Sequence, residues 1–267
     1  MDILNISHST PKEDLPLLTA EEAETYSWQL PVTGFGELAQ RRLKGASVLI
    51  SRVGGLGGSV AFQLAAAGVG RLILAHGGNL RANDLNRQLL MTQDHLGKPR
   101  IDSAVARLKA LNPRLEIIAE ASNICVDNVN RLTDLADVVV DCAPLFEERY
   151  LLNRHAMAQG KPMVEAAVYD LEFHLTTFFP GRTGCLRCLY PEPSTTWTRR
   201  FPVLGAVAGT AGSLAALETI KVITGMPGNL ASRLLCCDLS SYRMTFLNTQ
   251  RVPECSDCGF LLSSVQI

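Results

Sequence analysis

The alternation of buried strand and helix across residues 46–167 limits the fold more than any other feature. Apolar runs rich in Val, Ile and Leu predict strands at 46–51, 71–75, 115–119, 137–141 and 162–167. Helical segments separate these runs, at 59–67, 98–111, 127–135 and 147–159. Strand–helix–strand units of this length predict an α/β fold, with a doubly wound, mostly parallel sheet covered by helices on both faces. Any ligand is then expected at the carboxyl ends of the strands.

The pattern of apolar and polar residues divides the chain into three parts. Residues 1–20 are predicted to be an N-terminal arm, residues 21–170 the nucleotide-binding region, and residues 171–267 an extension of the same domain. The remaining predicted elements are helices at 21–30 and 37–43 (the second capped by Gly45), strand-like runs at 171–179 and 234–247, and a long helix at 206–224. No low-complexity linker separates the parts, so we expect one continuous domain.

Composition excludes several classes of protein. The 267 residues are 47% hydrophobic and 19% charged, which is typical of a globular chain. A net charge of −1 argues against a nucleic-acid binder. The longest apolar stretch, 201–225, is interrupted by Glu218 and Lys221 and falls short of a membrane span. The N-terminus resembles no export signal, so we expect a cytoplasmic protein in a reducing compartment.

A glycine-rich turn joins the first predicted strand to its helix. Gly54 and Gly57 occupy the second and third glycine positions of the pattern G-x-G-x-x-G, and Arg52 stands at the first. Such a Rossmann-like turn binds phosphates at the helix N-terminus; the alternative is a tight turn without a ligand. The second strand ends at His76, without the acid that binds ribose in NAD enzymes, so simple dehydrogenase chemistry is disfavoured.

Two C-x-x-C pairs lie in the C-terminal region. Cys185 and Cys188 form the first pair, and Cys255 and Cys258 form the second. In a reducing compartment this spacing predicts one structural zinc ion held by four thiolates, which would staple the C-terminal tail to the body. A thioredoxin-like redox site is the alternative, although such sites use a single pair. The other four cysteines lie in apolar surroundings and are expected to be small buried hydrophobic residues.

The order of these features resembles the MoeB/ThiF/HesA superfamily, bacterial relatives of ubiquitin-activating enzymes, over nearly the whole chain. The landmarks are LPVTGFGELAQRRLKGASVLI, VGGLGGSVAFQLAAAGVGRLILA, LNRQ, LGKPR, LKALNP, VVVDC, GCLRCLYP, SLAALETIKVITG and CSDCG. The HesA branch is the most similar, through LILAHGGNLRANDLNRQLL, KPMVEAA and VLGAVAGT. The resemblance implies a homodimer that binds ATP and Mg²⁺ at the strand ends. In MoeB and ThiF proteins the reaction is adenylation of the C-terminal Gly-Gly carboxylate of a ubiquitin-fold sulfur carrier.

Matching by position assigns candidate site residues. The nucleotide contacts are expected at Gly54, Gly55, Gly57, Arg87, Gln88, Lys98 and Arg100. Arg87 is the best candidate for a phosphate ligand, Asp84 is a carboxylate for a metal ion, and Asp141 points upward from the fourth predicted strand. The alternative for Asp84 and Asp141 is an ordinary polar residue at a helix start or strand end.

Several residues of the adenylating set are replaced. Relative to the family pattern, an arginine, a glycine and three acids are exchanged, at Trp28, Arg52, His76, Gly78 and Pro144. Loss of one pre-organised charge costs roughly 3 kcal/mol of transition-state stabilisation, so ordinary adenylation needs substitutes.

Three functions are compatible with this sequence. The leading hypothesis is a HesA-like, ATP-dependent protein of molybdenum or sulfur cofactor assembly, with molybdate or nitrogenase cofactor-assembly proteins as partners. The second is an adenylyltransferase that activates a ubiquitin-fold sulfur carrier. The third is a non-catalytic subunit or a metal- or carrier-binding module that keeps the fold and the zinc ion.

Overall fold

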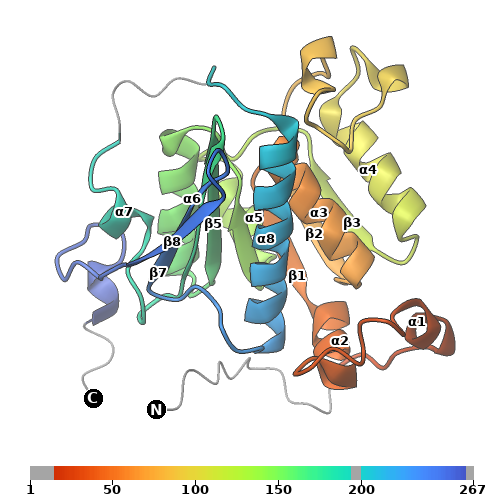
Figure 1. Cartoon of the computed structure of the whole chain (residues 1–267), viewed down its shortest axis with the longest axis horizontal. Coiled ribbons are helices and arrows are strands. Elements are labelled where there is room, and N and C mark those ends of the chain that lie inside the picture. Colours follow the sequence, from red (N-terminus) through yellow and green to blue (C-terminus); the bar gives the residue numbers. More distant parts are fainter. Residues whose placement is uncertain (1–14, 194–199, 263–267) are drawn as a thin grey trace.

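The computed structural model describes residues 15–193 and 200–262. Within these residues eight strands form one sheet in the order β3-β2-β1-β4-β5-β6-β7-β8 (Figure 1). The strands are β1 (Ser47–Ile50), β2 (Arg71–Ala75), β3 (Glu116–Glu120), β4 (Val138–Asp141), β5 (Met163–Tyr169), β6 (Glu172–Phe178), β7 (Arg233–Asp238) and β8 (Arg243–Asn248). The helices are α1 (Ala20–Thr25), α2 (Gly36–Gly45), α3 (Gly55–Ala67), α4 (Arg100–Leu111), α5 (Val129–Asp134), α6 (Phe146–Ala158), α7 (Leu186–Leu189) and α8 (Gly205–Thr224). Short 3-10 helices lie at Ala82–Asp84, Gln93–His95 and Gly259–Leu262.

The direction of winding reverses at the centre of the sheet. Strands β1 to β5 are parallel, and β6 to β8 continue the sheet in antiparallel pairs. In β1, Ile50 pairs with Leu74 of β2 on one side and with Val140 of β4 on the other. The chain runs outward through β2 and β3 and then returns to β4, so β1 and β4 flank a topological switch point. Crevices at the carboxyl ends of strands at such points are the usual ligand sites of this architecture.

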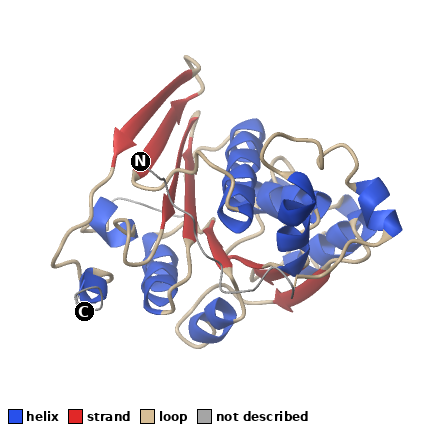
Figure 2. Ribbon diagram, turned by 90° about the horizontal axis from the view of Figure 1, so that it is seen from below, coloured by secondary structure: helices blue, strands red, loops and turns tan. Residues whose placement is uncertain are grey.

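The two faces of the sheet have separate cores. Val48 and Ile50 of β1 pack into the core beneath α3, α4 and α8. Leu49, between them, packs into the core beneath α5 and α6. Figure 2 shows helices on both sides of the sheet. Burial on both faces explains why the inner strands are continuous apolar runs rather than alternating ones.

Helix α8 is apolar because it lies in the core. By length and composition it is the one described helix that qualifies as a membrane span, with 56% of its most apolar window buried inside the protein. It packs along α3 and against β5 and β6. At Gly212 an added Cβ would lie 2.5 Å from the Leu56 carbonyl oxygen, so glycine allows the two helices to approach closely. Core packing therefore accounts for the composition of α8.

The fold class predicted from the sequence is confirmed, with differences at element boundaries. Helix α3 begins at Gly55, four residues before the predicted start at 59, because the glycine turn itself forms its first turn. Gly45 was predicted to cap the second helix but is the last residue of α2, and Ala46 is the C-cap. The run at 234–247 is two strands, β7 and β8, rather than one. Of the predicted N-terminal arm, residues 1–14 lie outside the described part.

Candidate nucleotide site and candidate metal centre

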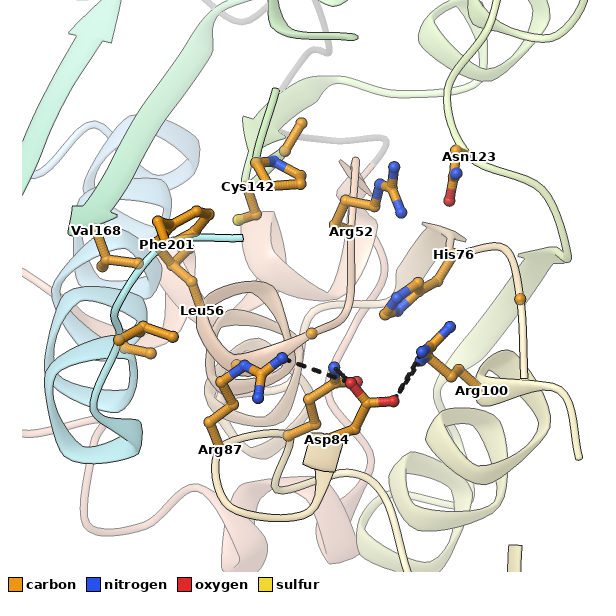
Figure 3. A pocket seen from close by; sticks show the side chains of 18 of the residues that line it. Arg52, Leu56, His76, Asp84, Arg87, Arg100, Asn123, Cys142, Val168 and Phe201 are labelled. Atoms are coloured by element: carbon orange, nitrogen blue, oxygen red, sulfur yellow. Dashed lines mark hydrogen bonds and ion pairs between the residues drawn. The ribbon is translucent and has the colours of Figure 1, made fainter. Parts of the chain in front are cut away.

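A cavity of 1340 Å³ opens at the carboxyl ends of the parallel strands. Its lining comes from the segments that follow β1, β2, β3 and β4, from β5, and from the loop and short helix at 79–88. Arg100 of α4, Arg149 of α6 and the segment 200–208 also contribute. Figure 3 shows side chains from these separate elements converging on one space. The cavity therefore occupies the place where the switch point of the sheet predicts a ligand.

The glycine turn directs the N-terminus of α3 into this cavity. Gly54 and Gly55 line it. Gly57 is not among the lining residues; an added Cβ there would lie 1.7 Å from the Arg52 carbonyl oxygen, so Gly57 is required for packing. The first backbone hydrogen bond of the helix runs from the Gly58 amide to the Gly54 carbonyl, at 2.9 Å. The preceding amides face the cavity end of the helix, where its dipole favours an anion.

Asp84 organises the polar side of the cavity. Its Oδ2 accepts hydrogen bonds from Arg100 Nε at 3.0 Å, from Arg100 Nη2 at 2.7 Å and from the Arg81 amide at 3.0 Å. Its Oδ1 accepts one from Gln88 Nε2 at 2.8 Å, and Arg87 Nη2 lies 3.5 Å away (Figure 3). One buried carboxylate thus orients two guanidinium groups that line the cavity.

A second ion pair lies beside the glycine turn. Arg52, at the first position of the glycine pattern, donates from Nε to a Glu148 carboxylate oxygen at 2.7 Å and also pairs through its Nη2. Both side chains are largely buried. Glu148 belongs to α6, so this pair joins the turn after β1 to the helix after β4. Arg52 is therefore held by a counter-charge at the wall of the cavity.

Asp141 lies behind the cavity rather than in it. This residue is fully buried at the end of β4 and is absent from the lining. Its Oδ2 accepts a hydrogen bond from Arg149 Nε at 2.9 Å, and Arg149 Nη2 donates to Glu165 Oε1 at 2.5 Å. Burial raises the pKa of Glu165 to about 7, although Arg149 opposes that shift. Asp141 therefore acts on the cavity through Arg149, which does line it.

His76 is an uncharged side chain between cations. It is 5% exposed, and its ring lies near Arg52 and Arg100 (Figure 3). Burial, together with the charges of the two guanidinium groups, lowers the pKa of His76 to about 3. Among the described residues its Nδ1 has no hydrogen-bond partner, and the same holds for Gln88 Oε1. Both side chains flank Gly54 at the base of the cavity.

The predicted site residues are only partly brought together. Gly54, Gly55, Asp84, Arg87, Gln88 and Arg100 all line the cavity. Lys98 is exposed outside it, on the turn before α4. Sequence reasoning missed Arg81, Asn123, Arg149 and Arg200, which also contribute to the lining. Arg81 lies close to the motif residues in sequence, but the position of Arg149 follows only from how α6 packs beside β4 and β5.

The Mg²⁺ ion that the family resemblance implies does not fit the acidic groups present. Protein ligands for Mg²⁺ are chiefly carboxylate oxygens, supplemented by water and substrate phosphates. Asp84 is the one carboxylate among the described lining residues. Both of its oxygens already accept hydrogen bonds, mostly from arginine. The expected metal-binding role of Asp84 therefore gains no support from its geometry.

The four cysteines of the two C-x-x-C pairs form a compact cluster. All four sulfur atoms lie within 4.8 Å of one another. Individual separations are 4.0 Å between Cys185 and Cys188, 3.7 Å between Cys185 and Cys255, and 3.5 Å between Cys188 and Cys258. A tetrahedral zinc ion with Zn–S bonds of about 2.3 Å requires sulfur separations of roughly 3.8 Å. The cluster is thus compatible with a four-thiolate zinc site.

Neighbouring groups hold the cysteine cluster against α6. Asn153 Nδ2 lies 3.6 Å from Cys185 Sγ, and its Oδ1 accepts a hydrogen bond from the Leu186 amide at 3.0 Å. The same Nδ2 donates to buried Asp257 at 3.0 Å. The Val252 amide donates to Cys188 Sγ at 3.3 Å. Donors of this kind orient thiolate ligands and stabilise their charge.

The switch-point cavity, the glycine turn and the cysteine cluster together place the molecule among Rossmann-like α/β proteins with a four-cysteine cluster in the C-terminal region. The sequence matches the ThiF family over residues 26–257, and the chain belongs to that family.

Individual proteins of known name are also similar to this chain. The heterocyst HesA protein of Trichormus variabilis is 50% identical, with 91% of each chain covered. A sulfur carrier protein adenylyltransferase of Thermus thermophilus is 35% identical, with 90% of this chain and 92% of the relative covered. Among solved structures, E. coli MccB with ATP has a TM-score of 0.73 and 26% identity, over 83% of this chain and 69% of that one. The chain is thus a HesA-like member whose relatives include adenylyltransferases.

Proposed function

We propose that this chain binds ATP in the switch-point cavity and activates a carboxylate by adenylation, in the assembly of a molybdenum or sulfur cofactor. The observation that carries the proposal is the arginine-lined cavity at the N-terminus of α3. Phosphates are the ligands that guanidinium groups and helix N-termini bind best in combination. The similarity to a sulfur carrier protein adenylyltransferase supports the choice of a carrier C-terminus as the acceptor.

The proposed reaction is an in-line displacement at phosphorus. A carboxylate oxygen of the acceptor attacks the α-phosphorus of ATP, and the bond to the oxygen that bridges the α- and β-phosphates breaks. The products are an acyl adenylate and pyrophosphate, so atoms and charge balance. Arg87 and Arg100, fixed by Asp84, are proposed to hold the phosphates and the departing pyrophosphate. Neutral His76 and Gln88, beside Gly54, would face an uncharged part of the nucleotide.

The cysteine cluster is proposed to hold a structural zinc ion. A four-thiolate site has no open coordination position, so the ion would link chain segments rather than act on substrate. We further propose that the chain is a homodimer, as the family resemblance implies. Neither feature enters the reaction written above. Participation of nitrogenase cofactor-assembly proteins or molybdate stays a prediction of the resemblance to HesA.

Binding of ATP tests the nucleotide part of the proposal. Isothermal titration calorimetry of the wild-type chain should give a saturable signal. Arg87→Ala should weaken binding by about tenfold or more, because a charge-assisted hydrogen bond contributes roughly 1.5–3 kcal/mol. Arg107→Ala, at an exposed position of α4 away from the cavity, is the matched control and should bind like the wild type. Equal ATP affinity of the two variants would show that Arg87 does not contact the nucleotide.

Exchange of pyrophosphate into ATP tests the chemistry. Exchange that requires a carrier ending in Gly-Gly would support adenylation. A second function, a non-catalytic carrier-binding module, has one observation in its favour: Arg52 is already paired with Glu148 at the first position of the glycine pattern. ATP binding without exchange for any carrier tested would support that second function.

A further inference from the structure

Positively charged side chains outnumber negatively charged ones among the described residues that line the cavity. Among the described residues that line it, Asp84 is the one carboxylate, and Arg52 and Arg149 are paired with acids behind the lining. Six arginines contribute to this lining: Arg52, Arg81, Arg87, Arg100, Arg149 and Arg200. Asp84 is shared between Arg87 and Arg100, so one negative charge faces two positive ones. A cavity with this balance attracts highly charged anions, and any additional cation in it is repelled.

The acids nearest the cavity are already committed to arginine. Glu148 pairs with Arg52, and Asp141 and Glu165 both pair with Arg149. Asp141 and Glu165 are fully buried, and Glu148 is nearly so. Releasing Glu148 as a metal ligand would leave the buried Arg52 guanidinium without its counter-charge, which is strongly unfavourable. None of these three acids is a lining residue, so Asp84 is the one carboxylate that lines the cavity in the described part of the chain.

We propose that this cavity binds its polyphosphate ligand free of a divalent cation, with guanidinium groups supplying the neutralisation for which related chemistry uses a metal ion. The inference rests on the proposed function, because it takes ATP as the ligand. Planar guanidinium groups bind phosphate oxygens bidentately and lose little freedom when they are held in advance. Asp84 holds Arg100 in this way through two hydrogen bonds to one oxygen.

A direct consequence concerns the form of the nucleotide. Chelation by Mg²⁺ cancels part of the triphosphate charge and shields oxygens that arginines would bind. Free ATP should then bind at least as tightly as its magnesium complex. An ordinary acidic metal site gives the opposite order, because its carboxylates bind the ion together with the phosphates.

Calorimetry with three probes at constant ionic strength tests the inference: ATP with EDTA, ATP with excess Mg²⁺, and inorganic triphosphate with EDTA. The expected result is saturable binding of ATP in EDTA, no weaker than in Mg²⁺. Tighter binding of the magnesium complex overturns the inference and leaves the proposed function standing. Binding of triphosphate without binding of ATP upholds the inference about the anion site and overturns the proposed function. Absence of binding by all three probes overturns both.

An isosteric variant tests the role of charge. Asn123 lines the cavity, and its Oδ1 accepts a hydrogen bond from the Gly77 amide at 2.9 Å, which an aspartate oxygen preserves. Asn123→Asp should weaken the binding of free ATP by about tenfold relative to the binding of the magnesium complex. One added negative charge near the phosphates changes the affinity by at least that factor. Asn130→Asp, at an exposed position of α5 outside the cavity, is the control. If both variants keep the wild-type ratio, the arginine-based explanation is wrong.

Discussion

The cysteine cluster and the switch-point cavity are specified in different ways. The cluster consists of four identical ligands at fixed local spacing, and its neighbours need only bring two short segments together. The cavity is assembled from side chains on many elements, and several of its charged side chains are paired with partners on other segments of the chain. Arg52 and Glu148, for example, are separated by 96 positions. A site of identical ligands depends on each ligand, whereas a site of paired charges depends on which partner each charge has.

Loss of one ligand should have the largest effect and sharpen this contrast. Cys255→Ser should lose the zinc ion proposed for the cluster and lower the free energy of unfolding by at least about 4 kcal/mol, because structural zinc contributes on the order of 10 kcal/mol. Metal content is measured by plasma mass spectrometry, and stability by urea unfolding. Cys125→Ser, at a cysteine outside the cluster, should keep the metal. A Cys255→Ser chain with full metal content would show that the cluster is not a four-ligand site.

Removing the shared counter-charge of the cavity should have the next largest effect. Asp84→Asn leaves Arg100, whose side chain is 8% exposed, without a negative partner. The free energy of unfolding should fall by roughly 3 kcal/mol, as when one partner of a buried pair is removed. Asp102→Asn, at an exposed position of α4, should change it little. Urea unfolding measures this change, and an unchanged midpoint of unfolding in Asp84→Asn would mean that the guanidinium groups are not held by this carboxylate.

The smallest expected effect is the pH dependence that His76 contributes. The pKa of His76 is about 3 in the folded chain, below its ordinary value of 6.5. Between these values the unfolded chain binds a proton that the folded chain does not, so His76 lowers stability as the pH falls below 6.5. The wild type should lose up to about 1.4 kcal/mol per pH unit relative to His76→Asn. Urea unfolding between pH 7 and pH 5 measures this slope, and a constant difference would contradict the shift.

The two regions also differ in how much of each could be predicted from the sequence. Cys185, Cys188, Cys255 and Cys258 were identified together, because C-x-x-C spacing carries its chemistry locally. The strand pattern likewise predicted the parallel sheet, since burial on both faces gives unbroken apolar runs. The pairing of Arg149 with Asp141 and Glu165 was not predictable, because it depends on how α6 packs over β4 and β5. Lys98 was chosen on charge and position in a motif, yet its side chain lies outside the cavity.

The packing of α8 against α3 has a consequence for how the chain is synthesised. The glycine turn, β1 and α3 leave the ribosome early, whereas α8, which covers them, begins only at residue 205. Until then Leu56 and Val60 of α3 lack the neighbours that bury them in the finished protein. The glycine turn thus acquires its final support late, and the nascent chain presents an apolar helix face in the meantime. Such a face is where chaperones bind and where nascent chains associate wrongly.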